Sequence, residues 1–257
     1  MIPRSLFILL LCLTVLLPVS ATARDRPPVI AAAASMQPVL QAMADRFEAR
    51  TGAQVRFSFG ASGNLRRQIT RGAPFQLFLS ADAEQPAALM AAGRVDGRAD
   101  TYALGSLALV LRDGLLAQRE VMLEDLPDLV REGLIRRFAI ASPEHAPYGI
   151  AARSVLQQAA VWEAVQGVLV IGENVGQTAQ FMRSGAADAG LVAGSFLSDP
   201  RFAETVRAVP LAPDSYQLPR HDLVLLEGAG ATARAFRNFV LSADGRAILE
   251  AYGFRVP

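Results

Sequence analysis

Residues 54–82, QVRFSFGASGNLRRQITRGAPFQLFLSAD, decide the fold class. Residues 54–59 alternate and are rich in β-branched and aromatic side chains, which predicts a strand. Residues 64–71 have a helical pattern that stops at Gly72, and the apolar run 77–80 predicts a second strand. A helix between two strands of this length is typical of a parallel pair with a crossover connection, so the stretch favours an α/β protein.

The same alternation continues on both sides of this stretch. An apolar run at 28–34 is followed by a helical pattern at 37–51, which Gly52 ends, and a further helix is predicted at 85–92. The order of strands and helices therefore predicts an open, mostly parallel sheet with flanking helices.

A second α/β block follows, framed by two long apolar strands at 104–112 and 221–227. The elements predicted inside it are helices at 123–132, 150–165 and 176–184 and strands at 138–141, 168–171 and 189–192, and two helices at 231–241 and 243–252 follow the second framing strand. We therefore expect two lobes joined by two crossing segments. Lobe I is expected at 24–104 plus 225–257 and lobe II at 105–224, with bending near 104–106 and 220–224.

The first 23 residues have the pattern of a secretory signal peptide. Arg4 precedes an apolar run at 6–17, and Ala21 and Ala23 form an A-x-A cleavage signal. The run is shorter than the ~20 residues that a membrane span needs. Cleavage after Ala23 would remove the single cysteine, Cys12, so the exported chain is expected to have no disulfide and no thiolate chemistry.

The composition excludes several classes of function. The chain has 257 residues, and its 25 basic residues are all arginine, set against 24 acidic ones. A formal net charge of +1 excludes a generally basic protein that coats nucleic acid. The absence of lysine excludes a lysine P-loop or Schiff base. With 52% hydrophobic residues the chain is expected to fold as a globular protein.

Four junctions between a strand and a helix carry the functional signal, at 31–38, 58–65, 142–150 and 172–178. Ser35, Ser62, Tyr148 and Val175 stand at or near the helix starts. Each helix start leaves unpaired N–H groups and a partial positive charge, so several of them aimed at one point would bind an anion without a charged side chain. Serine caps are common in α/β proteins, and the signal is the set of four, two in each lobe.

The sequence supports an enzymatic function less well than anion binding. GASG at 60–63 lacks the second glycine of the G-x-S-x-G elbow because position 64 is Asn, so a secreted serine hydrolase using Ser62 is the less favoured reading. His221 and Asp222 are neighbours on one strand and point to opposite faces, which makes a poor relay. GAGATA at 228–233 resembles a dinucleotide fingerprint, but no strand follows its helix, so no cofactor is expected.

A metal-cation site is not expected either. Glu144 and His145 share a loop, and with His221 they lack the spacings of zinc ligands. Both histidines are interpreted as solvated or capping residues.

Taken together, the motifs AAAS (32–35), the region 58–82, LGSLALVL (104–111) and PEHAPYG (143–149), with AYGF at 251–254, resemble the periplasmic molybdate-binding proteins of ABC importers. The resemblance covers nearly the whole chain after residue 23. It implies a two-lobed solute-binding protein of type II, with an anion held between the lobes by backbone amides and hydroxyls.

The resemblance also implies site residues. The family's anion contacts fall on Ser35, Ser62, Tyr148 and Val175, with further contacts expected from the Met36 backbone, Gly63 and Gly176. Many members place a tyrosine hydroxyl on the anion from a position that is Ala193 here, and we expect Tyr148 to supply the replacement hydroxyl.

The expected function is periplasmic binding of molybdate and tungstate, without catalysis, and delivery to a membrane permease and its ATPase. A monomer is expected. Sulfate or a small organic acid is the alternative ligand, because Ala193 and Met36 depart from the family pattern.

Overall fold

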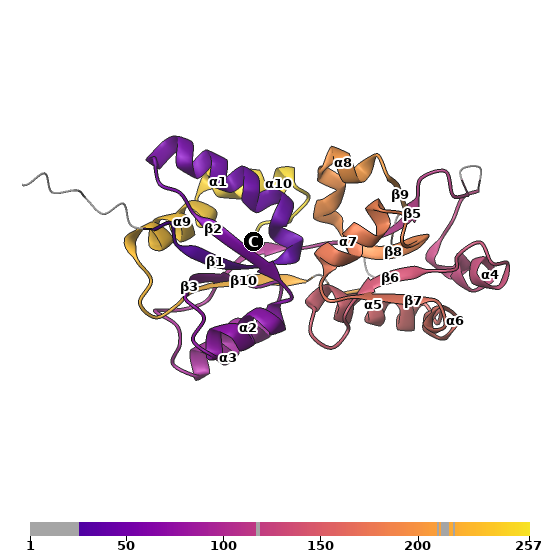
Figure 1. Cartoon of the computed structure of the whole chain (residues 1–257), viewed down its shortest axis with the longest axis horizontal. Helices are drawn as coiled ribbons and strands as arrows, with labels where there is room; N and C mark the ends of the chain where they lie inside the picture. Colours follow the sequence, from indigo (N-terminus) through magenta and orange to yellow (C-terminus); the bar gives the residue numbers. More distant parts are fainter. Residues whose placement is uncertain (1–25, 117–118, 210, 212–215, 218) are drawn as a thin grey trace, which may run out of the picture.

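The computed structural model describes residues 26–116, 119–209, 211, 216–217 and 219–257. The expected signal peptide at 1–23 lies outside these residues. Two five-stranded sheets form two lobes, which lie side by side along the long axis of the molecule (Figure 1). The predicted fold class, two α/β lobes with mixed sheets and two crossing segments, is confirmed. None of the helices in the described part of the chain is both long and apolar enough to cross a membrane.

The sheet of the first lobe has the strand order β2-β1-β3-β10-β4. Its strands are β1 (Val29–Ala33), β2 (Arg56–Gly60), β3 (Phe75–Leu79), β4 (Asp100–Leu104) and β10 (Arg220–Leu225). β1 pairs in parallel with β2 and β3, whereas β10 is antiparallel to both β3 and β4. The parallel core of this sheet is the part that the alternation of strands and helices predicts.

Helices cover both faces of this sheet. They are α1 (Gln37–Thr51), α2 (Ser62–Thr70), α3 (Glu84–Ala91), α9 (Ala231–Leu241) and α10 (Ala243–Ala251). α1, α9 and α10 lie on one face, and α2 and α3 lie on the other (Figure 1). The buried ring of Phe47 on α1 meets Phe236 on α9 edge-on, with ring centroids 5.2 Å apart, so the C-terminal helices complete the first lobe.

The sheet of the second lobe has the order β7-β6-β8-β5-β9. Its strands are β5 (Leu107–Arg112), β6 (Phe138–Ala141), β7 (Leu169–Gly172), β8 (Ala189–Ala193) and β9 (Val206–Val209). Its helices are α4 (Leu126–Arg131), α5 (Pro147–Gln158), α6 (Trp162–Gln166), α7 (Val175–Arg183) and α8 (Pro200–Ala203), and three short 3-10 helices, η1 (Ala34–Met36), η2 (Leu123–Asp125) and η3 (Gly194–Ser198), complete the element order.

The two sheets share one plan. In each sheet the fourth strand is antiparallel to its neighbours and is the strand that follows a crossing between the lobes: β5 in the second lobe and β10 in the first. Both strands are buried along most of their length, which explains their continuous apolar sequences.

The lobe boundaries differ from the expected ones. The apolar run 104–112 was expected to form one strand, but it contains the end of β4 and the whole of β5, which lie in different sheets on either side of Gly105 and Ser106. β10 belongs to the first sheet, so the second crossing precedes Arg220 instead of Leu225. An apolar strand pattern does not reveal which sheet the strand will join.

The helical pattern at 150–165 also forms two elements. α5 ends at Gln158 and α6 begins at Trp162, and Ala160 between them has a φ of 56°. That left-handed residue is incompatible with a continuous helix. The short helix α8 and strand β9 were not predicted.

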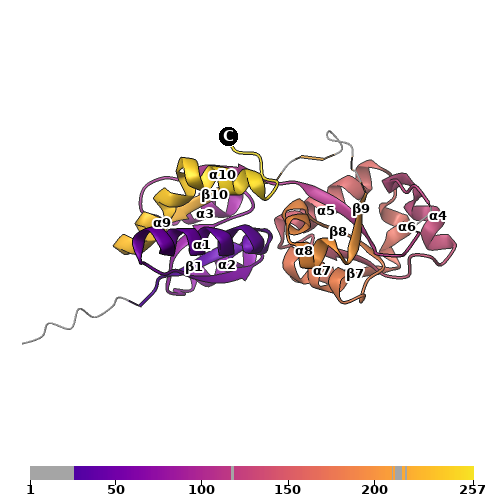
Figure 2. The same cartoon turned by 90° about the horizontal axis from the view of Figure 1, so that it is seen from above.

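The two crossing segments contact each other. The N–H of Gly105 donates to the carbonyl oxygen of Pro219 across 2.8 Å. A Cβ atom at Gly105 would lie 2.1 Å from Tyr148 Oη and 2.9 Å from His221 Nε2, so only glycine lets the backbone approach these side chains. Figure 2 shows the two lobes from above, with α1, α9 and α10 in one lobe and α5, α7 and α8 in the other.

Candidate functional site

A small cavity lies between the two lobes, where the four predicted junctions meet. It is lined by Ala33, Ala34, Ser35, Gly60, Ala61, Ser62, Ala81, Ala146, Pro147, Tyr148, Asn174 and Val175. About 10 Å³ of it is open to the centre of a water-sized sphere, which is room for about one water molecule and excludes a drug-sized organic ligand in this closed arrangement.

The topology explains why these residues meet. β1, β2, β6 and β7 are parallel strands within their lobes, and a helix start follows each of them within a few residues at its carboxyl end. Carboxyl ends of parallel strands share one edge of a sheet, and ligands bind outside that edge. η1, which leads into α1, faces α2 from the same lobe and α5 and α7 from the other. Residues from four helix starts therefore line one cavity, and each helix start carries a partial positive charge.

The two serines differ in how they are held. Ser62 is fully buried, and its Oγ accepts a hydrogen bond from the N–H of Ala81 at 3.0 Å, which leaves its own hydrogen free to donate. Ser35 is also fully buried, and its Oγ makes no well-formed hydrogen bond to the residues that the structure describes, although it lies close enough to the Tyr148 hydroxyl to offset part of the rise that burial causes in the pKa of that group. A buried hydroxyl without a partner costs free energy and is typical of a group that a ligand satisfies.

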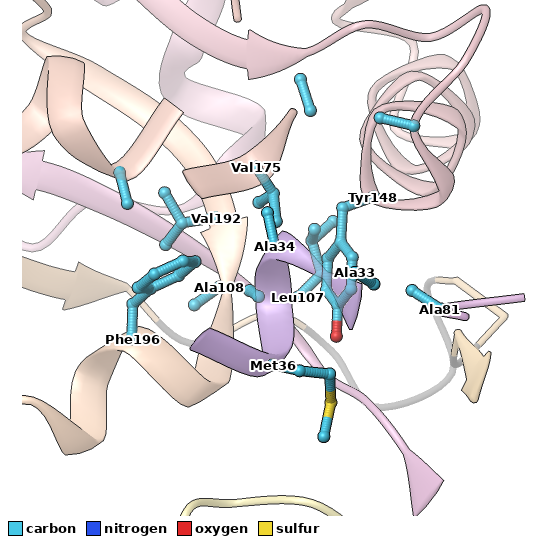
Figure 3. Close-up of a cluster of buried hydrophobic side chains, with 14 of the residues drawn as sticks. Ala33, Ala34, Met36, Ala81, Leu107, Ala108, Tyr148, Val175, Val192 and Phe196 are labelled. Carbon is cyan, nitrogen blue, oxygen red and sulfur yellow. The ribbon is translucent and has the colours of Figure 1, made fainter. Parts of the chain in front are cut away.

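Tyr148 and Val175 come from the second lobe and face Ala33 and Ala34 of the first (Figure 3). Both are buried, at 2% and 3% exposure. Burial raises the pKa of the Tyr148 hydroxyl, so it stays protonated and can donate. The Tyr148 hydroxyl oxygen lies 3.3 Å from His221 Nε2. Val175 is the first residue of α7, and the Asn174 side chain before it caps that helix by accepting from the Gln177 N–H.

Three further residues were expected at the site, and none of them lines the cavity. Met36 is buried, and its side chain points away from Ala34 and Val175 (Figure 3). The Gly63 N–H donates to the carbonyl oxygen of His145 in the other lobe at 3.3 Å, and a Cβ at Gly176 would lie 3.3 Å from the Cβ of Ala34. Gly63 and Gly176 thus let the lobes approach closely.

Two lining residues were missed by the sequence analysis. Ala81 follows β3, and Asn174 precedes α7. The N-cap pattern before α7 was a usable signal for Asn174. Ala81 contributes through its backbone N–H, which donates to Ser62 Oγ, and an alanine side chain gives no sequence signal of such a contact.

None of the cavity-lining residues is charged. Asp82 is near in sequence but is not part of the lining, and its carboxylate accepts from the Gln85 N–H at 2.7 Å. Burial raises the pKa of Asp82. A wall that offers hydroxyl and amide donors without a carboxylate suits a fully deprotonated anion.

The structure gives no support to a hydrolase or a metal-cation site. In the described part of the chain, no group of three His, Cys, Asp or Glu side chains could hold a metal ion. Ser62 has its hydrogen bond with Ala81, whereas the His221 ring faces the hydroxyls of Tyr102 and Tyr148. The expectation that His221 is solvated or capping is wrong, because it is fully buried on β10.

The lobes contact each other around the cavity. The Ser195 hydroxyl of η3 donates to the carbonyl oxygen of Ser35 at 2.7 Å, and the Asn64 side chain donates to Glu173 Oε1 at 2.9 Å. These bonds join the first lobe to the second, so the structure is that of a closed form.

Two α/β lobes, two crossing segments and a donor-lined cavity between the lobes define a hinged ligand-binding protein. The family model described as "Bacterial extracellular solute-binding protein" matches residues 28–255, and the chain belongs to this family.

Several relatives of the chain within this family are named as molybdate-binding proteins. The chain is 35% identical over 211 residues to the molybdate-binding protein ModA of Rhodobacter capsulatus, covering 81% of this chain and 80% of that protein. It is 31% identical over 228 residues to ModA of Azotobacter vinelandii, covering 88% of each. The solved periplasmic molybdate-binding protein of Azotobacter vinelandii matches with a TM-score of 0.78 and 29% identity, covering 90% of this chain and 99% of that one.

Proposed function

We propose that this protein binds molybdate, and tungstate, in the cavity between its lobes and delivers the anion to an ABC importer. The observation that carries the proposal is a cavity lined by residues from four helix starts, in which the buried Ser35 hydroxyl has no well-formed hydrogen bond to any described residue and lies beside the Tyr148 hydroxyl. The relatives named above as molybdate-binding proteins support the choice of anion.

The chemistry of the walls fits molybdate. Molybdate is fully deprotonated at neutral pH, so all its oxygens accept hydrogen bonds. Hydrogen phosphate carries a proton that needs an acceptor, and leaving that proton unpaired costs about 1–3 kcal/mol. Sulfate has the same charge as molybdate but is smaller, so its exclusion depends on rigid helix ends that fix the cavity size. Tungstate is nearly the size of molybdate and is expected to bind similarly.

The proposed contacts are the hydroxyls of Ser35, Ser62 and Tyr148 and the backbone N–H of Val175. Tyr148 stands in for the hydroxyl that Ala193 lacks. Ala193 is fully buried at the end of β8 and is not part of the cavity lining. Gly63 and Gly176 act as close-approach points between the lobes, and Met36, the last residue of η1, is buried in the core.

The protein is proposed to be a periplasmic monomer without catalytic activity, exported by its N-terminal segment. Closure over the anion is proposed to create the surface that the permease recognises, with the ATPase acting on the other side of the membrane.

Isothermal titration calorimetry with molybdate, tungstate, sulfate and phosphate tests the proposal on the exported protein. Tight one-to-one binding of the first two anions, with weak or no binding of the others, is expected. Sulfate that binds as tightly as molybdate, or no binding of molybdate, would overturn it. A Ser35→Ala variant shows whether any binding seen occurs in this cavity.

A further inference from the structure

His221 lies between two tyrosine hydroxyls that belong to different lobes. Its Nδ1 is 3.4 Å from the hydroxyl of Tyr102 on β4, and its Nε2 is 3.3 Å from the hydroxyl of Tyr148 on α5. The ring of Phe254 meets it edge-on, with centroids 5.3 Å apart, and the backbone of Gly105 passes directly beside Tyr148 and His221. His221 therefore joins the cavity tyrosine to the interior of the first lobe.

The imidazole is neutral at physiological pH. Burial lowers the pKa of His221 to about 3. The adjacent Asp222 has its own partner, because its carboxylate accepts two hydrogen bonds from Arg220 at 2.9 and 3.0 Å. A neutral imidazole has one ring nitrogen that donates and one that accepts, so the two tyrosines cannot have the same role toward it.

Two arrangements satisfy the geometry. In the first, Nδ1–H donates to Tyr102, whose own hydroxyl donates to the Ser80 carbonyl oxygen at 3.4 Å, and Nε2 accepts from Tyr148. The hydrogen of Tyr148 is then committed to His221 and cannot reach a ligand. In the second, Tyr102 donates to Nδ1, and Nε2–H donates to the Tyr148 oxygen. The hydrogen of Tyr148 is then free to point into the cavity, where the Ser35 hydroxyl and a bound anion are its acceptors.

We infer that His221 is a positioning residue whose tautomer decides whether the Tyr148 hydroxyl donates into the cavity, and that a bound, fully deprotonated oxyanion holds it in the Nε2–H form. This inference rests on the proposed function, because it requires an anion that accepts from Tyr148. His221 does not itself line the cavity, so the inference makes anion binding depend on a residue outside the cavity wall.

Nitrogen NMR of protein labelled with ¹⁵N-histidine reads the tautomer directly. The chain has only two histidines, and a His145→Gln variant assigns the spectrum. With molybdate bound, His221 is expected to show a protonated Nε2 and an unprotonated Nδ1. A molybdate complex with the proton on Nδ1, or with both nitrogens protonated, would overturn the inference.

Two substitutions separate positioning from packing. His221→Gln places an amide near the Nε2 position and is expected to keep molybdate affinity within a few-fold of wild type. His221→Asn reaches only the Nδ1 position, so it is expected to weaken molybdate binding ~10-fold, and the same loss is expected of Tyr148→Phe. The double variant with both substitutions is expected to lose no more affinity than either single variant. Thermal unfolding of each variant reports any structural damage separately.

The outcomes distinguish the two proposals. If the wild-type protein binds none of the oxyanions, the proposed function fails and this inference fails with it. If the wild-type protein binds molybdate but His221→Asn binds equally well, or if the losses at His221 and Tyr148 add fully, the proposed function stands and the role of His221 is refuted.

Discussion

The hydroxyl of Ser195 in the second lobe donates a hydrogen bond to the backbone carbonyl of Ser35 in the first lobe, across 2.7 Å. Both residues are buried. The bond holds the turn that carries the unpartnered Ser35 hydroxyl against the opposite lobe, so it links lobe closure to the position of one proposed anion donor.

Loss of this bond is expected to weaken binding indirectly. In Ser195→Ala the Ser35 carbonyl loses its partner in the closed form, and a typical net contribution of about 1 kcal/mol predicts a roughly five-fold lower molybdate affinity by calorimetry. Ser198→Ala is the matched control, because Ser198 lies on the same short helix η3 and is exposed. Equal affinities for the two variants would contradict a role of the Ser195 bond in closure.

Removal of the Ser35 hydroxyl is expected to separate binding from stability. A hydrogen bond to a charged ligand contributes about 1.5–3 kcal/mol, so Ser35→Ala is expected to lower molybdate affinity roughly 10- to 100-fold. The anion-free protein is expected to melt no lower than wild type, because the variant loses an unpartnered buried hydroxyl. Calorimetry and thermal unfolding without anion measure the two effects.

Ser62→Ala is expected to behave differently from Ser35→Ala. Ser62 Oγ accepts from the Ala81 N–H, so its removal leaves a buried donor unpaired at a cost of about 1–3 kcal/mol. The anion-free Ser62→Ala protein is therefore expected to melt below both wild type and Ser35→Ala, while its molybdate affinity also falls. Identical melting temperatures for the two alanine variants would show that the Ala81 bond contributes nothing to stability.

A methyl group at Gly105 is expected to disrupt the region where the lobes join. The Cβ of Gly105→Ala would lie 2.1 Å from Tyr148 Oη, so the tyrosine must move out of its place. Overpacking of this kind costs about 1–3 kcal/mol, and molybdate affinity is expected to fall at least ~10-fold. Gly167→Ala is the control, because its Cβ would meet nothing within 4 Å. A Gly105→Ala protein with wild-type melting temperature and affinity would contradict this close approach.

The buried imidazole of His221 predicts a pH dependence of stability. Its folded pKa of about 3 lies below the reference value of 6.5. The unfolded chain therefore binds a proton that the folded protein does not, and stability falls as the pH drops below 6.5. The contribution at pH 5 is about 2 kcal/mol less than at pH 8.

Urea unfolding at pH 8, 6.5 and 5 measures this loss as the difference between wild type and His221→Gln. His145→Gln is the matched control, because that side chain is 44% exposed, and it is expected to retain the wild-type dependence. An unchanged slope in His221→Gln would show that His221 does not titrate as its burial requires.

Much of the site was predictable, because its signals are local. Serine or glycine after a short strand and before a helix marks a helix start, and Ser35, Ser62, Tyr148 and Val175 are all in the cavity lining. Whether these groups contact the anion stays a prediction. The burial of His221 was not predictable, because it depends on Tyr102 and Phe254, which are far away in the sequence.

The lobe boundaries were predicted less well for a physical reason. An apolar run shows that a strand is buried but not which neighbours bury it, so 104–112 gave no sign that Leu104 and residues 107–112 enter different sheets. Gly105 contained a hint, because a glycine inside a strand pattern often marks a close backbone approach.

The return of β10 to the first sheet has a consequence for the order in which the protein can form. The second lobe is assembled from one continuous stretch that begins with β5 and ends with β9, whereas the first lobe needs β10, α9 and α10 from the last part of the chain. During synthesis from the N-terminus, the first lobe therefore lacks an inner strand until the ribosome has almost finished. This topology delays completion of the first lobe, although most of its strands are synthesised first. β3 stays without its neighbour β10 while the second lobe is being added.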